Sequence, residues 1–199
     1  MSKAPTYAFC YASMLLASSM LHIEAAADEP EIPRGADPGC VLPNSTTWIV
    51  QSPALPRSVN RNTCLAGRYR QQRVISVYTR EEGPAVWKAL QALDQQLASL
   101  PNVKAYVVIF KPLTDEQGYN ISRAQFEETR RLVTAANLSR LDVAIGRGGE
   151  SLLLGKEHSM KAAYSEQRRV SLTRTFAAGD AVKSIGQFTD DVRRALAEQ

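Results

Sequence analysis

The sequence predicts an α/β domain in which a central mixed sheet is flanked by helices and preceded by an irregular N-terminal lead-in. Three observations predict this class. Two β-rich apolar runs are separated by a stretch whose apolar residues have helical spacing. A capped amphipathic helix and a third apolar run follow them. Residues 169–176 then alternate between apolar and polar positions, and a last helical stretch follows. Strands that alternate with helices along a chain are typical of α/β architecture.

The first strand–helix–strand unit occupies about 37 residues, from position 74 to position 110. Residues 74–78 are β-branched or aromatic apart from one serine, which favours a buried strand. Pro84 suits the first turn of a helix, and Pro101 ends it because proline cannot continue the backbone hydrogen bonds. Residues 103–110 are apolar with little alternation, as in a strand covered on both faces, and such a crossover makes the two strands parallel. The apolar face of the intervening helix consists of Val86, Leu90, Leu93, Leu97 and Leu100.

The elements on either side of this unit are predicted from local signals. Residues 48–50 are expected to form a short first strand. Ser122 and Gln125 match a capping box, so a helix is expected to begin there. Asn137 is a suitable residue for its C-terminal end. Residues 141–145 are predicted to form the next strand.

The C-terminal part is predicted to contain a short helix, a hairpin and a last helix. The short helix is placed around residues 160–164. Residues 169–176 alternate like a strand with one solvated face. Residues 181–185 are expected to pair back as the second strand of the hairpin, ending at Gly186. Thr189 is then expected to cap the last helix.

The first 27 residues are predicted to be a cleaved signal peptide. Lys3 supplies a positive start, a mostly apolar stretch follows, and three alanines at 25–27 offer a small-residue cleavage site. A permanent membrane anchor would need about 20 apolar residues, and polar or charged residues such as Ser18 and Glu24 interrupt this run. We therefore expect an exported protein, periplasmic or secreted, without stable membrane insertion after cleavage.

Loss of the signal peptide removes Cys10 and leaves Cys40 and Cys64. Two cysteines in an exported chain usually form a disulfide. This bridge would tie a lead-in at residues 28–63 to a folded domain at residues 64–199 and would contribute about 3 kcal/mol. Two alternatives stay open: a redox-active pair, and unpaired or intermolecular thiols.

No catalytic, cofactor-binding or metal-binding residues are predicted. His158 is the only histidine that remains after export, and it has no partner at metal-ligand spacing. The glycine-rich stretch that ends at Lys156 has Glu150 and Glu157 where a phosphate-binding loop requires Gly and Ser or Thr. A formal net charge of +4 with scattered arginines argues against a nucleic-acid partner, because no binding motif or aromatic platform accompanies the charge.

The order of elements from residue 64 to residue 196 resembles the thioredoxin-like superfamily, in particular its redoxin and peroxiredoxin-like branch. The resemblance implies that the reactive cysteine belongs in the turn after the first strand of the βαβ unit, where thioredoxins have Cys-Gly-Pro-Cys. This chain has Glu82, Gly83, Pro84 and Ala85 at that place. The Gly-Pro pair is kept and both sulfur atoms are absent.

A second feature of that superfamily is a cis-proline just before the hairpin strand. The predicted elements put Arg168 and Arg169 in that neighbourhood, and no proline follows Pro112. Glu81 and Glu82 are expected to complement the dipole of the following helix and not to act as a catalytic acid pair. The resemblance therefore implies a degenerate scaffold without the catalytic cysteines.

The function expected from these observations is that of an exported, non-catalytic binding or interaction module, with a protein as its partner. The alternative is a divergent thiol-disulfide oxidoreductase or peroxidase that uses Cys64 and Cys40. A small-molecule or nucleic-acid binder forms a third class, but no cluster of residues in the sequence indicates it.

Overall fold

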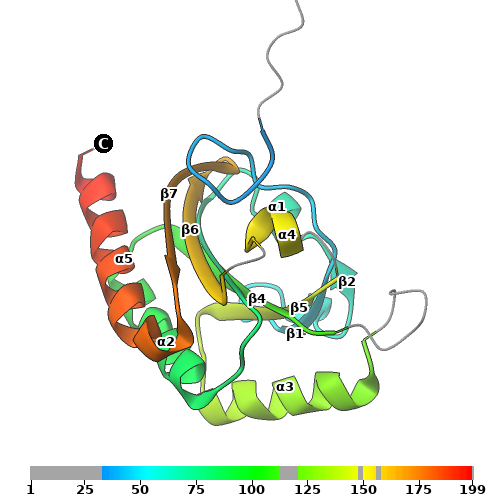
Figure 1. The fold of residues 1–199 in the computed structure, drawn as a ribbon. Coiled ribbons are helices and arrows are strands. Elements are labelled where there is room, and N and C mark those ends of the chain that lie inside the picture. Colours follow the sequence, from blue (N-terminus) through cyan, green and yellow to red (C-terminus); the bar gives the residue numbers. More distant parts are fainter. Residues whose placement is uncertain (1–32, 113–120, 148–149, 156–157, 199) are drawn as a thin grey trace, which may run out of the picture. The chain divides into compact units, whose positions relative to one another are not determined.

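The computed structural model describes residues 33–112, 121–147, 150–155 and 158–198. Residues 32–199 form one compact unit, built on a seven-stranded mixed sheet with the order β2-β1-β5-β4-β3-β6-β7 (Figure 1). β3, β4 and β5 are parallel, and all other neighbouring strands are antiparallel. The predicted mixed sheet and the parallel βαβ unit are therefore confirmed. The strands are β1 (Thr47–Gln51), β2 (Asn62–Thr63), β3 (Arg73–Thr79), β4 (Val103–Phe110), β5 (Leu141–Gly146), β6 (Met160–Glu166) and β7 (Arg169–Phe176).

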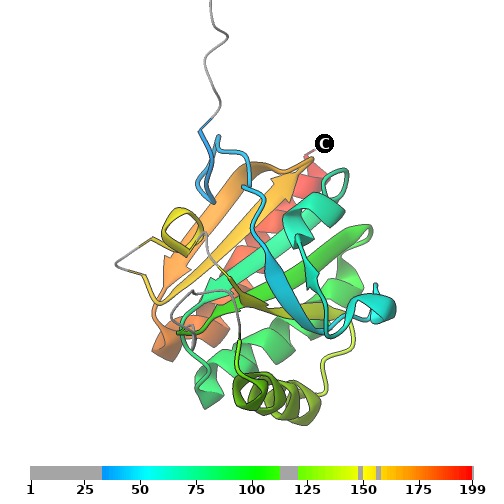
Figure 2. The same cartoon turned by 90° about the vertical axis from the view of Figure 1, so that its right-hand side faces the viewer.

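Three long helices pack on one face of the sheet: α2 (Pro84–Gln96), α3 (Arg123–Ala136) and α5 (Ala181–Ala197). The other face is covered by two short helices, α1 (Leu65–Arg68) and α4 (Glu150–Leu153), together with the lead-in before β1 (Figures 1 and 2). Three single 3₁₀ turns complete the fold: η1 (Pro56–Ser58), η2 (Leu97–Ser99) and η3 (Ala178–Asp180).

The central strands contribute to two separate hydrophobic cores. In β3, Ile75 and Val77 pack under the long helices, whereas Val74 and Tyr78 face the short helices and the lead-in. Successive side chains of a strand point to opposite faces, so a strand buried on both faces must be apolar at nearly every position. This explains why the strand is recognisable from sequence without a simple alternation.

The predicted ends of α3 are confirmed. Ser122 Oγ accepts from the backbone N–H of Gln125, and the Gln125 side chain accepts from the backbone N–H of Ser122, each at 3.1 Å. Asn137 follows the helix in the left-handed conformation, with φ of 48°. The predicted short first strand is confirmed as β1, which pairs with β5.

Two predictions in the C-terminal third are wrong. Residues 160–164 belong to strand β6, which pairs with β3 along its whole length. Residues 181–185 form the first turns of α5 and not a hairpin strand, and Gly186 and Thr189 lie inside this helix. Thr189 Oγ1 donates to the carbonyl of Ile185, so it bonds to the preceding turn of the helix and does not cap it. The hairpin is formed instead by β6 and β7.

The lead-in contributes more to the domain than an irregular segment would. β1 and β2 lie within residues 28–63, so the sheet begins before Cys64. Residues 39–42 bond to the start of β7: the N–H of Gly39 donates to the carbonyl of Val170, and the N–H of Val170 donates to the carbonyl of Cys40, both at 2.9 Å. The predicted signal peptide, residues 1–27, lies outside the described residues. In the described part of the chain, no helix is both long enough and apolar enough to cross a membrane.

Candidate functional site

The turn between β3 and α2 is the place where the resemblance puts a reactive cysteine. Thr79, the last residue of β3, fixes the turn: its Oγ1 accepts from the N–H of Glu81 at 2.9 Å and donates to the carbonyl of the same residue at 3.0 Å. Gly83 is the N-cap of α2 and Pro84 its first residue. Glu82 therefore lies just before the helix, and Ala85 lies in its first turn.

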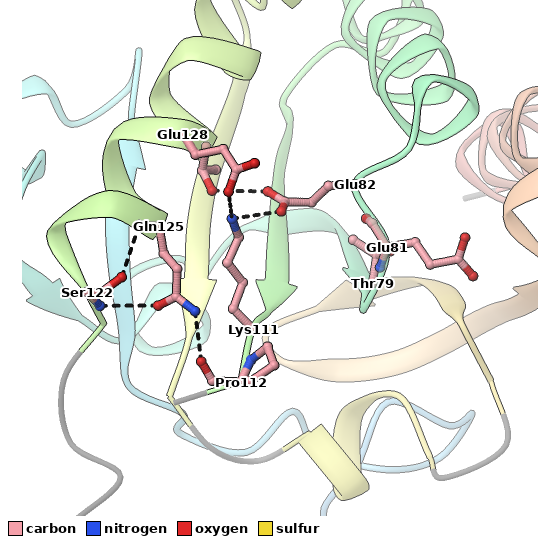
Figure 3. Close-up of polar contacts among 9 residues, drawn as sticks. Thr79, Glu81, Glu82, Lys111, Pro112, Ser122, Gln125 and Glu128 are labelled. Atoms are coloured by element: carbon pink, nitrogen blue, oxygen red, sulfur yellow. Dashed lines mark hydrogen bonds and ion pairs between the residues drawn. The ribbon is translucent and has the colours of Figure 1, made fainter. Parts of the chain in front are cut away.

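Glu82 is held by contacts with two other elements (Figure 3). Its carboxylate lies 2.7 Å from Nζ of Lys111, which directly follows β4. The hydroxyl of Thr129, in α3, donates to Oε1 of Glu82 at 3.0 Å. Only 8% of the Lys111 side chain is exposed, and its second carboxylate partner is the solvent-facing Glu128 at 3.5 Å. Glu81 points away from this cluster. The prediction that Glu82 complements the helix dipole is thus incomplete, because the main partner of Glu82 is a lysine from the neighbouring strand.

The end of β4 is attached to α3 by a second contact in the same region. The side-chain amide of Gln125 donates to the carbonyl of Pro112 at 2.9 Å, while its oxygen serves the capping box (Figure 3). The turn after β3, the residues after β4 and the first turns of α3 are therefore tied together by polar contacts. A carboxylate engaged in this way is neither a thiol nucleophile nor a free general base.

On the other side of the turn, Arg80 binds α4 and the segment between α4 and β6. Its guanidinium donates to the carboxylate of Glu150 and to the carbonyls of Gly155 and His158. Its backbone N–H donates to the carbonyl of Ser159 at 3.1 Å. Both the guanidinium and the backbone N–H of Arg80 are therefore hydrogen-bonded to other groups of the protein.

The observed hairpin moves the expected cis-proline position from Arg168 and Arg169 to Ser159. Ser159 directly precedes β6, the first strand of the observed hairpin, so the residue that corresponds to the expected proline lies there. Arg168 and Arg169 lie at the opposite end of β6, in the turn to β7 and at the start of β7. The described residues contain no cis peptide bond.

Cys40 and Cys64 are both free thiols in the structure. Cys64 is the N-cap of α1, where its Sγ accepts from the N–H of Gly67 at 3.1 Å and lies 3.6 Å from Oδ1 of Asn44. It packs against the core under the short helices, on the opposite face of the sheet from α2 and α3. Cys64 thus does not approach the contacts of Glu82 with α3, and the Cys40–Cys64 disulfide stays a prediction.

Two buried acids have structural roles that the sequence did not indicate. Asp94, on α2, accepts from the backbone N–H groups of Ser139, Arg140 and Leu141 at 2.7–3.1 Å and so fixes the loop that leads into β5. Asp142, in β5, accepts from the hydroxyl of Tyr69. Burial raises the pKa of Asp142, and the hydrogen bond from Tyr69 opposes that rise.

Aromatic residues fill the core under the short helices. The rings of Tyr69 and Tyr106 stack at 6.2 Å, and the hydroxyls of Tyr78 and Tyr106 lie 3.1 Å apart. Burial raises the pKa of Tyr78 to about 12. These tyrosines are buried and contribute their rings to the packing of this core.

Two open grooves lie near α3. One, of about 320 Å³, runs between α2 and α3 beside Glu82 and has an apolar wall that includes Trp87 and Leu132. The other, of about 540 Å³, lies between β1 and α3, with Trp48 and Phe126 on its walls and Arg123 and Arg130 on α3. The described residues contain no group of three His, Cys, Asp or Glu side chains that could hold a metal ion.

Comparison with protein-family models gives no match for this chain, and comparison with curated proteins gives none. Solved structures do match. A putative thiol:disulfide interchange protein DsbE from Chlorobium tepidum has a TM-score of 0.51 at 10% identity, over 78% of this chain and 96% of that one. Peroxidoxin BcpB from Mycobacterium tuberculosis has a TM-score of 0.48 at 9% identity, over 80% and 98%. A secreted disulfide oxidoreductase from the same organism, homologous to E. coli DsbE, has a TM-score of 0.46 at 9% identity, over 71% and 94%.

The expected fold is confirmed by the likeness to the Chlorobium tepidum protein: the chain has a thioredoxin-like fold. The order of elements is the predicted one, with β3, α2 and β4 as the βαβ unit, but the C-terminal hairpin is formed by β6 and β7 and not by residues 169–176 and 181–185. An identity of 10% supports the fold and does not transfer an activity.

Proposed function

We propose that this chain, with its thioredoxin-like fold, acts as a binding module for another protein and does not catalyse thiol redox chemistry at the turn between β3 and α2. The observation that carries the proposal is the position of Glu82. A thioredoxin-type site needs an accessible thiolate near the N-terminus of the helix. Here the corresponding side chain is a carboxylate, 2.7 Å from Lys111 and 3.0 Å from the hydroxyl of Thr129.

The contacts of Arg80 support the same proposal from the other side of the turn. Its guanidinium binds one carboxylate and two carbonyl groups of the segment before β6. A substrate that had to enter between the turn and this segment would have to break those bonds. A buried or half-buried ion pair is costly to open, because each charge then loses its partner.

A second candidate, a thiol enzyme that uses Cys64 and Cys40, is favoured by one specific observation. The N–H of Gly67 points at the Sγ of Cys64 from 3.1 Å. Cys64 is also the N-cap of α1, and reactive cysteines are often found at the N-terminus of a helix. Cys64 nevertheless lies on the other face of the sheet from the contacts between Glu82 and α3.

Two activity assays separate these candidates. The first follows consumption of hydrogen peroxide and the second follows reduction of insulin disulfides, both with dithiothreitol as reductant. Wild-type protein and the Cys40→Ser/Cys64→Ser variant are compared with buffer. A binding module gives rates equal to buffer for both proteins. A wild-type rate at least about tenfold above buffer that the double variant loses would establish the enzyme instead.

Export is a separate part of the proposal and rests on the pattern of residues 1–27. The mature chain is expected to begin near Asp28, which mass spectrometry of the protein from its native host can test. An intact N-terminus on the functional, soluble protein would overturn export and would remove the reason to expect a disulfide in an oxidising compartment. Pull-down with the mature chain from the envelope or medium would identify the partner.

A further inference from the structure

A strip of basic side chains crosses the end of the sheet opposite the β3–α2 turn. β3, β4 and β5 all begin at this end, and the β6–β7 turn lies there because Arg73 at the start of β3 pairs with Glu166 at the end of β6. Several basic residues that are far apart in the sequence are therefore neighbours at this end. The basic strip consists of Arg70, Lys104, Arg140, Arg168 and Arg169.

The strip follows the order of the strands and contains two grooves. Lys104, in β4, and Arg140, just before β5, line a groove of about 360 Å³ together with Tyr69. Arg70 and Arg168 line a second groove, of about 540 Å³, at the β6–β7 turn. Arg70 directly follows Tyr69 in the chain, so the two grooves lie on either side of the same short segment.

The charge of the strip is not balanced by carboxylates. All of its members are exposed except Arg168, which is half-buried and donates to the carbonyl of Leu42. In the part of the chain that the structure describes, none of the five forms an ion pair. The nearby Glu166 is paired with Arg73. Asp142 is buried and bonded to Tyr69, and it interacts electrostatically with Lys104 without forming an ion pair. The whole chain carries a net charge of +4, so the remainder without these five cations carries 4 − 5, or −1.

We propose that this strip binds an acidic segment of a partner protein, which names the partner class for the binding function proposed above and rests on it. Guanidinium groups match carboxylates in geometry and bind them in bidentate pairs. From β5 to β7 the strip crosses five strands. At about 4.8 Å between neighbouring strands this is roughly 19 Å, the length of about six residues of extended peptide.

The surroundings of the strip favour a peptide over two other polyanions. Single-stranded nucleic acids need exposed aromatic rings on which bases can stack, and Tyr69, the aromatic residue in the groove, is only 5% exposed. Membrane surfaces bind basic patches best when apolar side chains insert beside them. The exposed large apolar residues of the described chain, Leu152 and Val182, belong to α4 and α5 near the other end of the strands.

The test is the binding of a fluorescein-labelled hexaglutamate peptide to the full chain, measured by fluorescence anisotropy at 50 and 200 mM NaCl. We expect saturable binding that weakens as salt increases, because exposed charges are screened. Lys104→Glu with Arg140→Glu should weaken binding about tenfold or more, since two attractive contacts become repulsive. The matched control is Arg123→Glu with Arg130→Glu on α3, which changes the net charge equally and should weaken binding less than about threefold.

Circular dichroism and thermal unfolding check that the variants are folded. If the reversed pair is not, Lys104→Gln with Arg140→Gln takes its place, with an expected loss of about threefold. Equal losses in the strip variant and the α3 control would overturn the proposal, as would the absence of saturable binding at 50 mM NaCl. Tighter binding of a six-nucleotide single strand, or of vesicles with phosphatidylserine, than of the peptide would overturn it in favour of those ligands. The outcome does not depend on the redox assays, so failure here leaves the non-catalytic assignment standing.

Discussion

A cysteine in place of Glu82 would stand beside a nearly buried cation and just before the N-terminus of α2. Lys111 Nζ lies 2.7 Å from the carboxylate of Glu82, and 8% of its side chain is exposed. A thiolate at this place would replace the carboxylate as the counter-ion of Lys111. The Glu82→Cys thiol is therefore expected to ionise well below the usual pKa of about 8.5.

The size of this effect follows from the geometry. A cysteine side chain is two bonds shorter than glutamate, which leaves Sγ about 5 Å from Nζ. At an effective dielectric constant of 20, the attraction at that separation is about 3 kcal/mol, or roughly two pKa units. Glu128 shares the cation at 3.5 Å, and the turn is partly solvated, so we expect about half of this. The thiol pKa should thus lie near 7.

The assay is the rate of alkylation by iodoacetamide as a function of pH, in a background where Cys10, Cys40 and Cys64 are serine. Glu81→Cys is the matched control, because it lies in the same turn and points away from Lys111. Adding Lys111→Gln to Glu82→Cys should return the pKa to about 8.5, the value of a free cysteine. Equal pKa values for the two single variants would refute the reasoning about Lys111.

The same turn can be tested for its equivalence to Cys-Gly-Pro-Cys. Glu82→Cys combined with Ala85→Cys should form a bridge under mild oxidation, since the two positions flank the N-cap Gly83 and Pro84. Removing Glu82 also leaves Lys111 without its nearest carboxylate, so a loss of about 2 kcal/mol in unfolding free energy is expected. A double variant that stays reduced would mean that this turn does not correspond to the redox turn of thioredoxins.

Three further predictions concern stability and the native cysteines. Asp94→Ala should lower the unfolding free energy in urea by about 3 kcal/mol, because it leaves three backbone N–H groups without their acceptor, whereas the exposed Asp190→Ala should cost less than about 0.5 kcal/mol. Because the pKa of Asp142 is raised in the folded state, its contribution to stability is present at low pH and is lost as pH rises through the folded-state pKa. The unfolding free energy of Asp142→Asn minus that of the wild type should therefore increase from pH 4 to pH 8, by about 1.4 kcal/mol for each unit by which the pKa is raised. A difference that stays constant with pH would contradict this. If Cys40 and Cys64 form the predicted bridge, protein from its native host should show no titratable thiol until it is reduced in denaturant, and two fast-reacting thiols in the native protein would contradict the bridge.

The sequence predicted the centre of the fold because its signals there are local. The spacing of apolar residues between Pro84 and Pro101 defines one helix face, and the prolines mark its ends. The capping box at Ser122 and the left-handed Asn137 are likewise short-range signals that involve only a few neighbouring residues. Such signals predict helices and strands without knowledge of the partners.

The C-terminal errors arose where distant contacts decide the structure. The sequence Met-Lys-Ala-Ala-Tyr at 160–164 contains good helix formers, yet it forms β6 because it fills the place beside β3. In α5, buried residues recur at Ala181, Ile185, Phe188 and Val192, which is helical spacing. Gly186 has a low helix propensity and so favours a break at this position. Tertiary packing of α5 outweighs the free-energy cost of one glycine inside the helix.

The sequence contains a signal for the Glu82–Lys111 pair. β3 and β4 were predicted to be parallel neighbours, so the residues that follow them lie at the same edge of the sheet. An acid three residues after one strand and a lysine directly after the other are then candidates for an ion pair. The hydrogen bond from Thr129 in α3 cannot be predicted in this way, because the position of α3 depends on its packing against β1 and α2.

The two ends of the parallel strands differ in how their polar groups are used, and this difference connects the proposals. At the β3–α2 turn, Glu82, Lys111 and Arg80 are bound to groups of the protein itself. Rearranging these contacts to admit a substrate would break several charge-assisted bonds at once. At the opposite end, the basic strip keeps hydrated cations that form no ion pair among the described residues, and an acidic partner would supply the counter-charges. Binding is therefore expected at the end that carries the basic strip. The β3–α2 turn, where redox chemistry would occur, is expected to keep its internal contacts.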